Sequence, residues 1–381
     1  MTITRASTGA KPVLLLGAVS VAVGVSTAFA MPFGSLFLTT EVGVSPLALG
    51  TFMLITPVAS VVASTVVGRL SDTRMQRRTL MVIGGLAGAA GAALFAVLRD
   101  YWFLLGASAT FVAVASSLMP MIFAYARGLE RSGPFVISSL RTLFSVAWVA
   151  GPPVAALLVA TWGFTGLYVS TAVLYVVVAG LSLLLPSTVA VEAAPQDDAP
   201  VRGQRIPQVV AAFVLLQGAT GLAVSGLPLF VTTELHGTAG DAGLVLGLCA
   251  ALEIPLMLWL GALATRKDLH LIVLAGAAVA ITYHATMLTT TGIWQVAGAQ
   301  LLHAAAISAV MGVGISYFQS LEPTRPGHAS TLFSNTATAG GMLAGPLLGV
   351  AQAVGFRYTY AISLTMCVLG VTLLAFVRRP R

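Results

Sequence analysis

Two ionisable side chains interrupt long apolar stretches of this 381-residue chain. Glu253 lies in the middle of the stretch 240–264, and Arg141 lies near the start of the stretch 135–160. A charge at the centre of a membrane helix costs about 2.5–3.5 kcal/mol, so residues of this kind usually carry function. A desolvated carboxylate can bind a proton and release it when its surroundings change. We predict proton coupling by Glu253 and Arg141. The alternatives are a structural hydrogen bond at Glu253 and, for Arg141, a side chain that reaches the interface.

Neutral polar side chains also lie within the apolar stretches. Amides donate and accept hydrogen bonds, so they suit a hydroxyl-rich ligand, and an indole ring can stack on the face of a sugar. Gln300 and His303 are three residues apart and therefore share one face of a helix. Hydrogen bonds between helices and simple packing are the alternatives for each residue. The predicted substrate-binding set is Trp148, Gln217, Tyr283, Gln300, His303 and Asn335, and His284 is a further neutral polar residue within an apolar stretch.

The composition determines which elements must position these residues. Hydrophobic residues make up 57% of the chain and charged residues only 8%, whereas soluble domains carry about 25% charged residues. The chain is therefore predicted to be an all-α integral membrane protein, because a spanning helix needs about 20 apolar residues. Twelve stretches qualify: 13–38, 46–68, 79–98, 101–125, 135–160, 164–186, 207–231, 240–264, 269–290, 293–318, 328–352 and 356–377.

The chain also repeats itself. The motif LFLTTE ends at Glu41, the motif LFVTTE ends at Glu234, and Ala-Gly-Pro recurs from Ala150 to Ala344 at nearly the same offset. Repeated landmarks in the same order indicate an internal duplication. We predict an N-terminal six-helix bundle at 1–186, a polar cytoplasmic linker at 187–206 and a C-terminal six-helix bundle at 207–381. In the repeat, Asn335 is the position of the second half that corresponds to Arg141 in the first half.

The distribution of Lys and Arg predicts the orientation. If the N-terminus faces the cytoplasm, the outer loops contain only Arg99 and Arg357, and the remaining basic residues, apart from Arg141, lie in inner segments. Cytoplasmic loops carry an excess of basic residues. Both termini are therefore predicted to be cytoplasmic in a multi-pass protein of the bacterial cytoplasmic (inner) membrane. The charges are scattered between apolar stretches, which excludes a nucleic-acid-binding patch.

The break after the second stretch, residues 68–78, reads GRLSDTRMQRR. It resembles the G-x-L-a-D-r-x-G-r-R loop of the major facilitator superfamily, whose two halves are parallel repeats. The resemblance implies a conformational latch formed by Gly68, Asp72, Arg77 and Arg78. This chain departs from the pattern, because Met75 replaces the usual Gly and the basic pair comes one residue late.

Further stretches narrow the resemblance. TTEVGVSPLALGTF, MPMIFAYAR, SLRTLFSVAWVAGPP and YFQSLEPTRPGHASTLFSN are similar to the bacterial sugar efflux transporter family within that superfamily. The resemblance implies proton-coupled export of sugars or glycoside-like molecules by a monomer in the bilayer. A drug exporter of the same fold is the alternative.

Several other chemistries lack their motifs. The chain has no GxxxxGK[ST] loop, no HExxH and no GxSxG, which argues against a P-loop ATPase and against the common hydrolases. His270, His284 and His303 do not have the spacing of zinc ligands. No enzyme activity, cofactor or metal is predicted, and the expected partners are a small-molecule substrate, protons and lipid.

Overall fold

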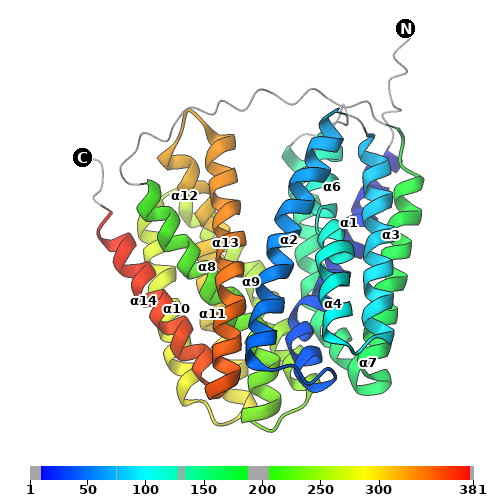
Figure 1. The fold of residues 1–381 in the computed structure, drawn as a ribbon. Coiled ribbons are helices and arrows are strands. Elements are labelled where there is room, and N and C mark those ends of the chain that lie inside the picture. The colour runs from blue at the N-terminus through cyan, green and yellow to red at the C-terminus, as the bar shows by residue number, and fades with distance from the viewer. Residues whose placement is uncertain (1–9, 74, 128, 130–133, 188–205, 378–381) are drawn as a thin grey trace. The chain divides into compact units, whose positions relative to one another are not determined.

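The computed structural model describes residues 10–73, 75–127, 129, 134–187 and 206–377 (Figure 1). All regular elements in these ranges are helices. They are α1 Ala10–Thr40, α2 Pro46–Thr73, α3 Arg77–Val97, α4 Tyr101–Ala107, η1 Ser108–Val112, α5 Ala113–Ala115, α6 Leu118–Arg127, α7 Pro134–Leu183, α8 Ile206–Leu229, η2 Phe230–Glu234, α9 Ala239–Ala264, α10 Leu269–Thr289, α11 Ile293–Ile307, η3 Ser308–Val313, α12 Gly314–Leu321, α13 Pro326–Val354 and α14 Tyr358–Ala375. The three η elements are π-helical segments continuous with their neighbours.

The described residues contain eleven helices long and apolar enough to span a membrane, where the sequence predicts twelve. The difference lies in α7, which carries both the fifth and the sixth predicted stretch. A straight helix of 50 residues would be about 75 Å long, more than twice the hydrocarbon thickness of about 30 Å. At Gly163 the backbone takes φ 63° and ψ −171°, which divides α7 into two arms. The all-helical membrane fold is confirmed.

The chain forms two compact units. The N-terminal unit comprises Met1–Met31 and Ile55–Pro195, and the C-terminal unit comprises Pro32–Leu54 and Gln196–Arg381. One boundary falls inside the predicted linker 187–206. The segment Pro32–Leu54, which contains the end of α1 and the start of α2, packs within the C-terminal unit. The division at 187–206 into two repeated six-helix bundles remains a prediction.

Hydrogen bonds fasten the segment Pro32–Leu54 within the C-terminal unit. The hydroxyl of Ser35 donates to the carbonyl of Ser225 over 2.6 Å, and the amide of Gln352 donates to the carbonyl of Val44 over 3.0 Å. Farther along the segment, α2 and α13 approach so closely that a Cβ on Gly349 would lie 2.4 Å from the carbonyl oxygen of Pro46. Small residues permit this approach, as is usual between membrane helices.

In the N-terminal unit, α3 packs along α7 (Figure 1). The contact depends on glycine, because a Cβ on Gly85 would lie 2.8 Å from the backbone nitrogen of Ala179. A buried apolar core that includes Leu16, Met81 and Ile122 lies among α1, α3 and α6. This unit holds Arg141, Trp148 and the predicted latch.

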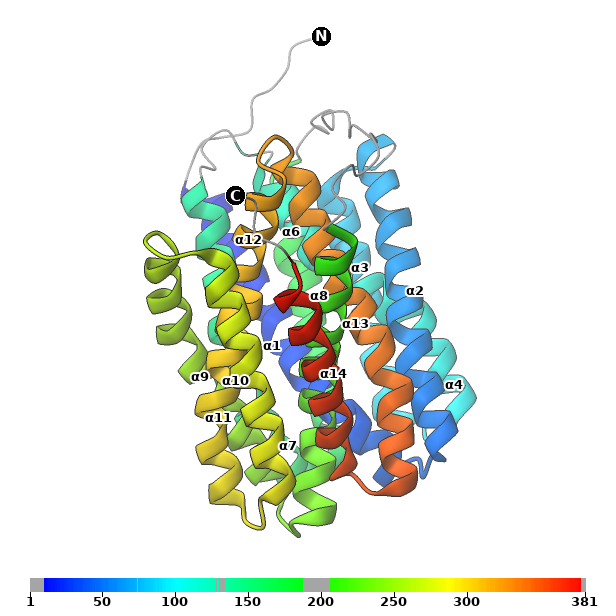
Figure 2. The ribbon, with the colours of Figure 1, turned by 90° about the vertical axis from the view of Figure 1, so that its left-hand side faces the viewer.

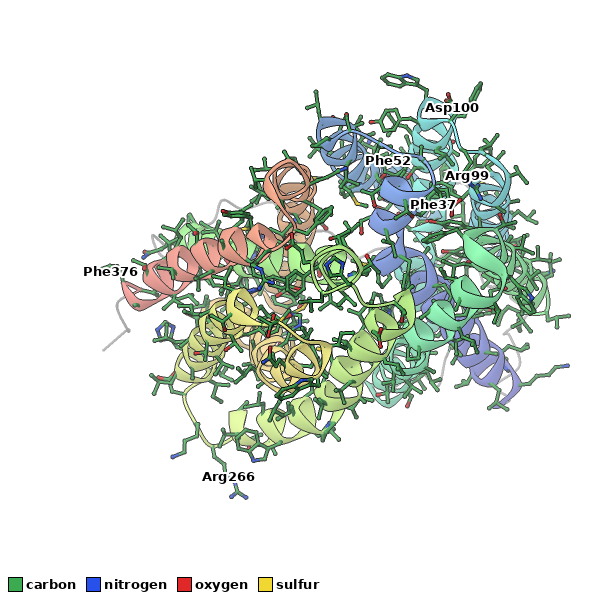
Figure 3. All side chains as sticks on the ribbon, turned by 90° about the horizontal axis from the view of Figure 1, so that it is seen from below. Phe37, Phe52, Arg99, Asp100, Arg266 and Phe376 are labelled. Carbon is green, nitrogen blue, oxygen red and sulfur yellow. The ribbon has the colours of Figure 1, made fainter. Side chains whose placement is uncertain are left out.

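In the C-terminal unit, α8 packs against α13 and α14, α10 packs against α11 and α14, and α11 packs against α9 (Figure 2). Loops at one end carry the cations Arg266, Lys267 and Arg325, so we call it the basic end. Figure 3 shows Arg266 extending away from the helices. The opposite end carries Glu234 and Arg357. The helices thus hold charged residues at their ends and enclose a largely apolar interior.

We predict that Gly340→Ala destabilises the C-terminal unit. A Cβ at Gly340 would lie 2.6 Å from the backbone nitrogen of Gly218, so α8 and α13 would have to separate. Overpacking of this kind costs about 1–3 kcal/mol, which should lower the Tm of the detergent-solubilised protein. Gly341→Ala is the matched control, because a Cβ there meets no described atom within 4 Å. Equal Tm values for the two variants would contradict the packing argument.

Candidate functional site

Arg77, in the predicted latch, is buried where α3 begins. Its Nε donates to the hydroxyl of Ser71 over 3.4 Å, and its Nη1 donates to the carbonyl of Ala124 in α6 over 2.6 Å. Arg78 is only half-buried. A Cβ on Gly68 would meet no described atom within 4 Å, so in this conformation Gly68 serves no close helix contact. The side chain of Asp72 lies outside the described residues, and the latch remains a prediction.

We predict that Arg77→Gln lowers stability more than Arg78→Gln does. Arg77 is a buried charged donor with two partners, and hydrogen bonds to charged groups contribute about 1.5–3 kcal/mol. Replacement of the half-buried Arg78 should lower the free energy of unfolding less, by about 0.5 kcal/mol or below, as substitutions at surface positions do. Thermal unfolding in detergent measures both variants. The expectation fails if Arg78→Gln unfolds at the same temperature as Arg77→Gln or below it.

Glu253 lies in the middle of α9 and is mostly buried. The thiol of Cys249, one turn earlier, donates to the Glu253 Oε1 over 3.5 Å. The hydroxyl of Ser308, at the start of the π-helical segment η3, donates to the backbone carbonyl of Glu253 over 3.3 Å. Pro255 follows within the same helix. π-helical segments in membrane helices frequently mark functional sites, and this one contacts the predicted proton-coupling residue.

The C-terminal unit brings Tyr283, Gln300 and His303 together. The rings of Tyr283 and His303 stack with centroids 4.2 Å apart and planes 2° from parallel. The Nδ1 of His303 lies 3.4 Å from the Oε1 of Gln300 and 3.7 Å from the Sγ of Cys249. All three predicted residues are buried. Because the thiol of Cys249 contacts both His303 and Glu253, it connects this group of residues to Glu253.

Two further aromatic residues extend this cluster towards the end of the unit that carries Arg357. The ring of His284 lies 6.2 Å from the ring of Tyr360, and Tyr360 packs edge-on against Phe230 at 5.0 Å. The guanidinium of Arg357 lies 5.1 Å above Phe230 and donates to the carbonyls of Leu288 and Thr290 at 2.9 and 2.8 Å. The cluster thus continues from the middle of α9 to the first turn of α14.

The other predicted binding residues lie apart from this cluster or in different surroundings. Gln217 in α8 is buried and donates to the hydroxyl of Thr336 in α13 over 2.6 Å, which fits the alternative of a hydrogen bond between helices. Asn335 in α13 is exposed. Trp148 is half-buried in α7, in the N-terminal unit, and the side chain of Arg141 lies outside the described residues.

One face of α13, where Asn335 lies, carries exposed polar side chains. Thr331 and Ser334 are exposed beside Asn335, and this helix has the lowest mean hydropathy, 1.3, of the eleven candidate spans. Lipid offers no hydrogen bonds, so polar side chains in spanning helices usually face the protein interior or water. Asn335 thus lies where a hydroxyl-rich ligand could reach it.

Sequence reasoning missed Cys249 and Tyr360. The spacing of Cys249 and Glu253, four residues on one helix, could have indicated their contact. No sequence signal connects Tyr360 to Tyr283, because the two residues lie on helices that meet only in the folded chain. Among the described residues, no group of three His, Cys, Asp or Glu side chains could hold a metal ion.

Comparison with known proteins defines the class. The family model described as Major Facilitator Superfamily matches residues 14–343. The crystal structure of the nucleoside transporter NupG has a TM-score of 0.79 at 13% identity over 97% of this chain and 100% of that one, which shows a shared fold. This chain belongs to the Major Facilitator Superfamily. It is therefore a membrane transporter and not an enzyme.

Curated relatives narrow the comparison within the superfamily. A relative from Deinococcus radiodurans is 34% identical over 375 residues, which cover 94% of this chain and 96% of the relative. Sugar efflux transporter A from Dickeya chrysanthemi is 33% identical over 352 residues, which cover 90% of each chain. The similarity therefore extends over nearly the whole length and includes both units.

Proposed function

We propose that this chain exports sugars or glycoside-like small molecules from the cytoplasm, by proton antiport and alternating access. Relatives named as sugar efflux transporters, similar over nearly their full length, support the substrate class. The exposed polar face of α13 at Asn335 also favours a hydroxyl-rich substrate over the apolar compounds that a drug exporter of this fold would carry. Glu253 supports the proton coupling, because its carboxylate lies deep in a spanning helix.

Antiport requires one group to bind a proton from one side and yield it to the other. Among the described residues, Glu253 is the acidic side chain in the middle of a long apolar helix, whereas Glu234 and Asp268 lie at helix ends. Burial disfavours the charged carboxylate, and contact with water or a cation favours it. A change of exposure between two conformations would therefore load and unload Glu253. Arg141 is the proposed cation of this exchange.

A flux assay with a substrate panel tests the proposed function. Purified protein in liposomes, with an imposed pH gradient, should accumulate at least one labelled sugar or glycoside against its concentration gradient. Dissipating the pH gradient with a protonophore should abolish the accumulation. Proton-driven transport of hydrophobic cationic drugs with no sugar transport would replace this proposal with its alternative.

For Glu253→Gln, we predict loss of accumulation driven by the pH gradient and retention of downhill exchange. The amide keeps the size of the side chain and its hydrogen-bonding capacity but cannot titrate. Accumulation should fall to the level measured without a gradient. Asp268→Asn is the control, since Asp268 lies at the basic end of the unit and an amide can keep its contact with the backbone N–H of His270. Uphill accumulation by Glu253→Gln would exclude this residue as the coupling site, and loss of exchange as well would assign it to substrate contact.

The proposed orientation places the basic end of the C-terminal unit in the cytoplasm, together with both termini. Arg266, Lys267 and Arg325 support it through the preference of basic loops for the cytoplasmic side. Inward proton flow would then enter at the end that carries Glu234 and Arg357.

Cysteine labelling tests this orientation at the two ends of α10. Lys267 and Thr291 are exposed in the loops before and after that helix, and the native Cys249 and Cys367 are buried. A membrane-impermeant maleimide should label Thr291→Cys in intact cells, and should label Lys267→Cys only after permeabilisation. The opposite pattern would invert the proposed orientation.

A further inference from the structure

A run of polar side chains leads from Glu253 to the Arg357 end of the C-terminal unit. It consists of Cys249 in α9, His303 in α11, Tyr283 and His284 in α10, and Tyr360 in α14, and we call it the polar ladder. These helices are direct neighbours, as Figure 2 shows for α9, α10 and α11. Glu253 follows the start of α9 by 14 residues, so the ladder covers about 20 Å along the helix axes.

Hydrogen bonding assigns the proton on the inner part of the ladder. The Nε2 of Gln300 donates to the carbonyl of Val296 over 3.0 Å, which leaves Oε1 of Gln300, an acceptor, beside the Nδ1 of His303. A neutral imidazole carries its proton on one nitrogen, and an acceptor beside Nδ1 favours the proton there. That Nδ1–H also points to the Sγ of Cys249, whose own S–H donates to Glu253. The N–H of His303 and the S–H of Cys249 therefore both face towards the carboxylate.

The outer part of the ladder contains buried polar atoms without protein partners. Among the described residues, the Nε2 of His303, the Nδ1 of His284 and the hydroxyls of Tyr283 and Tyr360 have no hydrogen-bond partner. Their side chains are at most 4% exposed. An unsatisfied buried polar atom costs about 1–3 kcal/mol, and four of them within one cluster are unexpected in a structural core. Small movements or single water molecules between them would satisfy all four.

We propose that the polar ladder is the route by which protons travel from the external solution to Glu253, inside the C-terminal unit. This inference rests on the proposed proton antiport. It assigns Tyr283 and His303, which the sequence suggested for substrate binding, to proton transfer. It adds Cys249, His284 and Tyr360 as residues of the transport cycle.

The transfer conserves protons at every step. A proton arriving from Tyr360 and His284 adds to the Nε2 of His303, the Nδ1–H passes to the Sγ of Cys249, and the S–H passes to the Oε1 of Glu253. Glu253 becomes neutral, Cys249 regains its proton, and His303 ends as the other neutral tautomer. A flip of the imidazole ring then places its N–H beside Cys249 again and restores the starting arrangement. The contacts of 3.7 Å between His303 and Cys249 and of 3.5 Å between Cys249 and Glu253 must shorten during transfer, as hydrogen bonds at functional sites commonly do when the reactive state forms.

Charged groups at the outer end determine what can enter. Arg357 lies above the ring of Phe230, which packs against Tyr360, and the carbonyls of Leu288 and Thr290 accept its hydrogen bonds. Glu234 lies close to Gly355 at the same end, its Oε1 3.3 Å from the position of a Cβ there. The fixed cation disfavours entry of metal cations. A proton passed between hydroxyl and imidazole groups needs no hydrated ion to enter.

The test measures proton-driven accumulation relative to downhill exchange, with the full chain in liposomes and the sugar identified by the substrate panel. Cys249→Ala removes one group of the ladder and Cys249→Ser restores a donor and acceptor. His284→Gln and Tyr360→Phe remove groups farther out. Cys367→Ala and His270→Gln are matched controls, because Cys367 is a buried cysteine outside the ladder and His270 lies near the basic end, bonded to Tyr317.

The route predicts that Cys249→Ala, His284→Gln and Tyr360→Phe lower the ratio of accumulation to exchange about tenfold. Cys249→Ser should recover most of it, and the matched controls should stay near the wild-type ratio. For the wild-type protein, replacing H₂O with D₂O should slow accumulation more than it slows exchange. Wild-type ratios in all three ladder variants, while Glu253→Gln is uncoupled, would overturn the route and leave Glu253 as the coupling site. Uphill accumulation by Glu253→Gln would overturn the proposed coupling itself.

Discussion

The C-terminal unit depends on the accommodation of one carboxyl group in an apolar bundle. Glu253 cannot keep a bare charge among helices that are hydrophobic on every side, and it cannot be neutral without a partner for its proton. The thiol of Cys249, one turn away, donates to the carboxylate of Glu253. The hydroxyl of Ser308, at the start of the π-helical segment η3, donates to the backbone carbonyl of Glu253. His303, stacked on Tyr283, lies beside the thiol. Position, packing and proposed chemistry follow from this one requirement.

Helix packing supplies the rigidity that such a cluster needs. α8 and α13 meet at Gly218 and Gly340, and α10 approaches η3 where Gly276 faces Ala309. Between membrane helices, close approach of backbones replaces much of the hydrophobic driving force available in water. The side chains on the facing surfaces are therefore fixed in depth, so that Glu253, His303 and Tyr283 keep their spacing. The exposed face of α13 at Asn335 lies outside these contacts.

Much of this could be predicted from the sequence, and the limits have a physical cause. Apolar runs of sufficient length identify membrane helices, and a lone Glu253 inside one is visible at once. The pairing of Gln300 with His303 follows from helical spacing. Contacts between helices cannot be predicted in this way. These helices are apolar all round, so the sequence pattern does not indicate which face meets which neighbour. Tyr360 was missed for this reason. The bend of α7 at Gly163 falls between the predicted stretches 135–160 and 164–186, but the continuation of α7 as one 50-residue element was not predicted.

The segment Pro32–Leu54 has a mechanical consequence. Two helices, α1 and α2, each begin in one compact unit and end in the other, and the changes occur at 31/32 and at 54/55. Each change has a proline close by: Pro32 stands directly at the change in α1, and Pro57 lies three residues beyond Leu54 in α2. Proline removes a backbone hydrogen bond and lets a helix bend. Each of these two helices can therefore bend close to the point where it passes from one unit to the other, and neither has to unfold to do so.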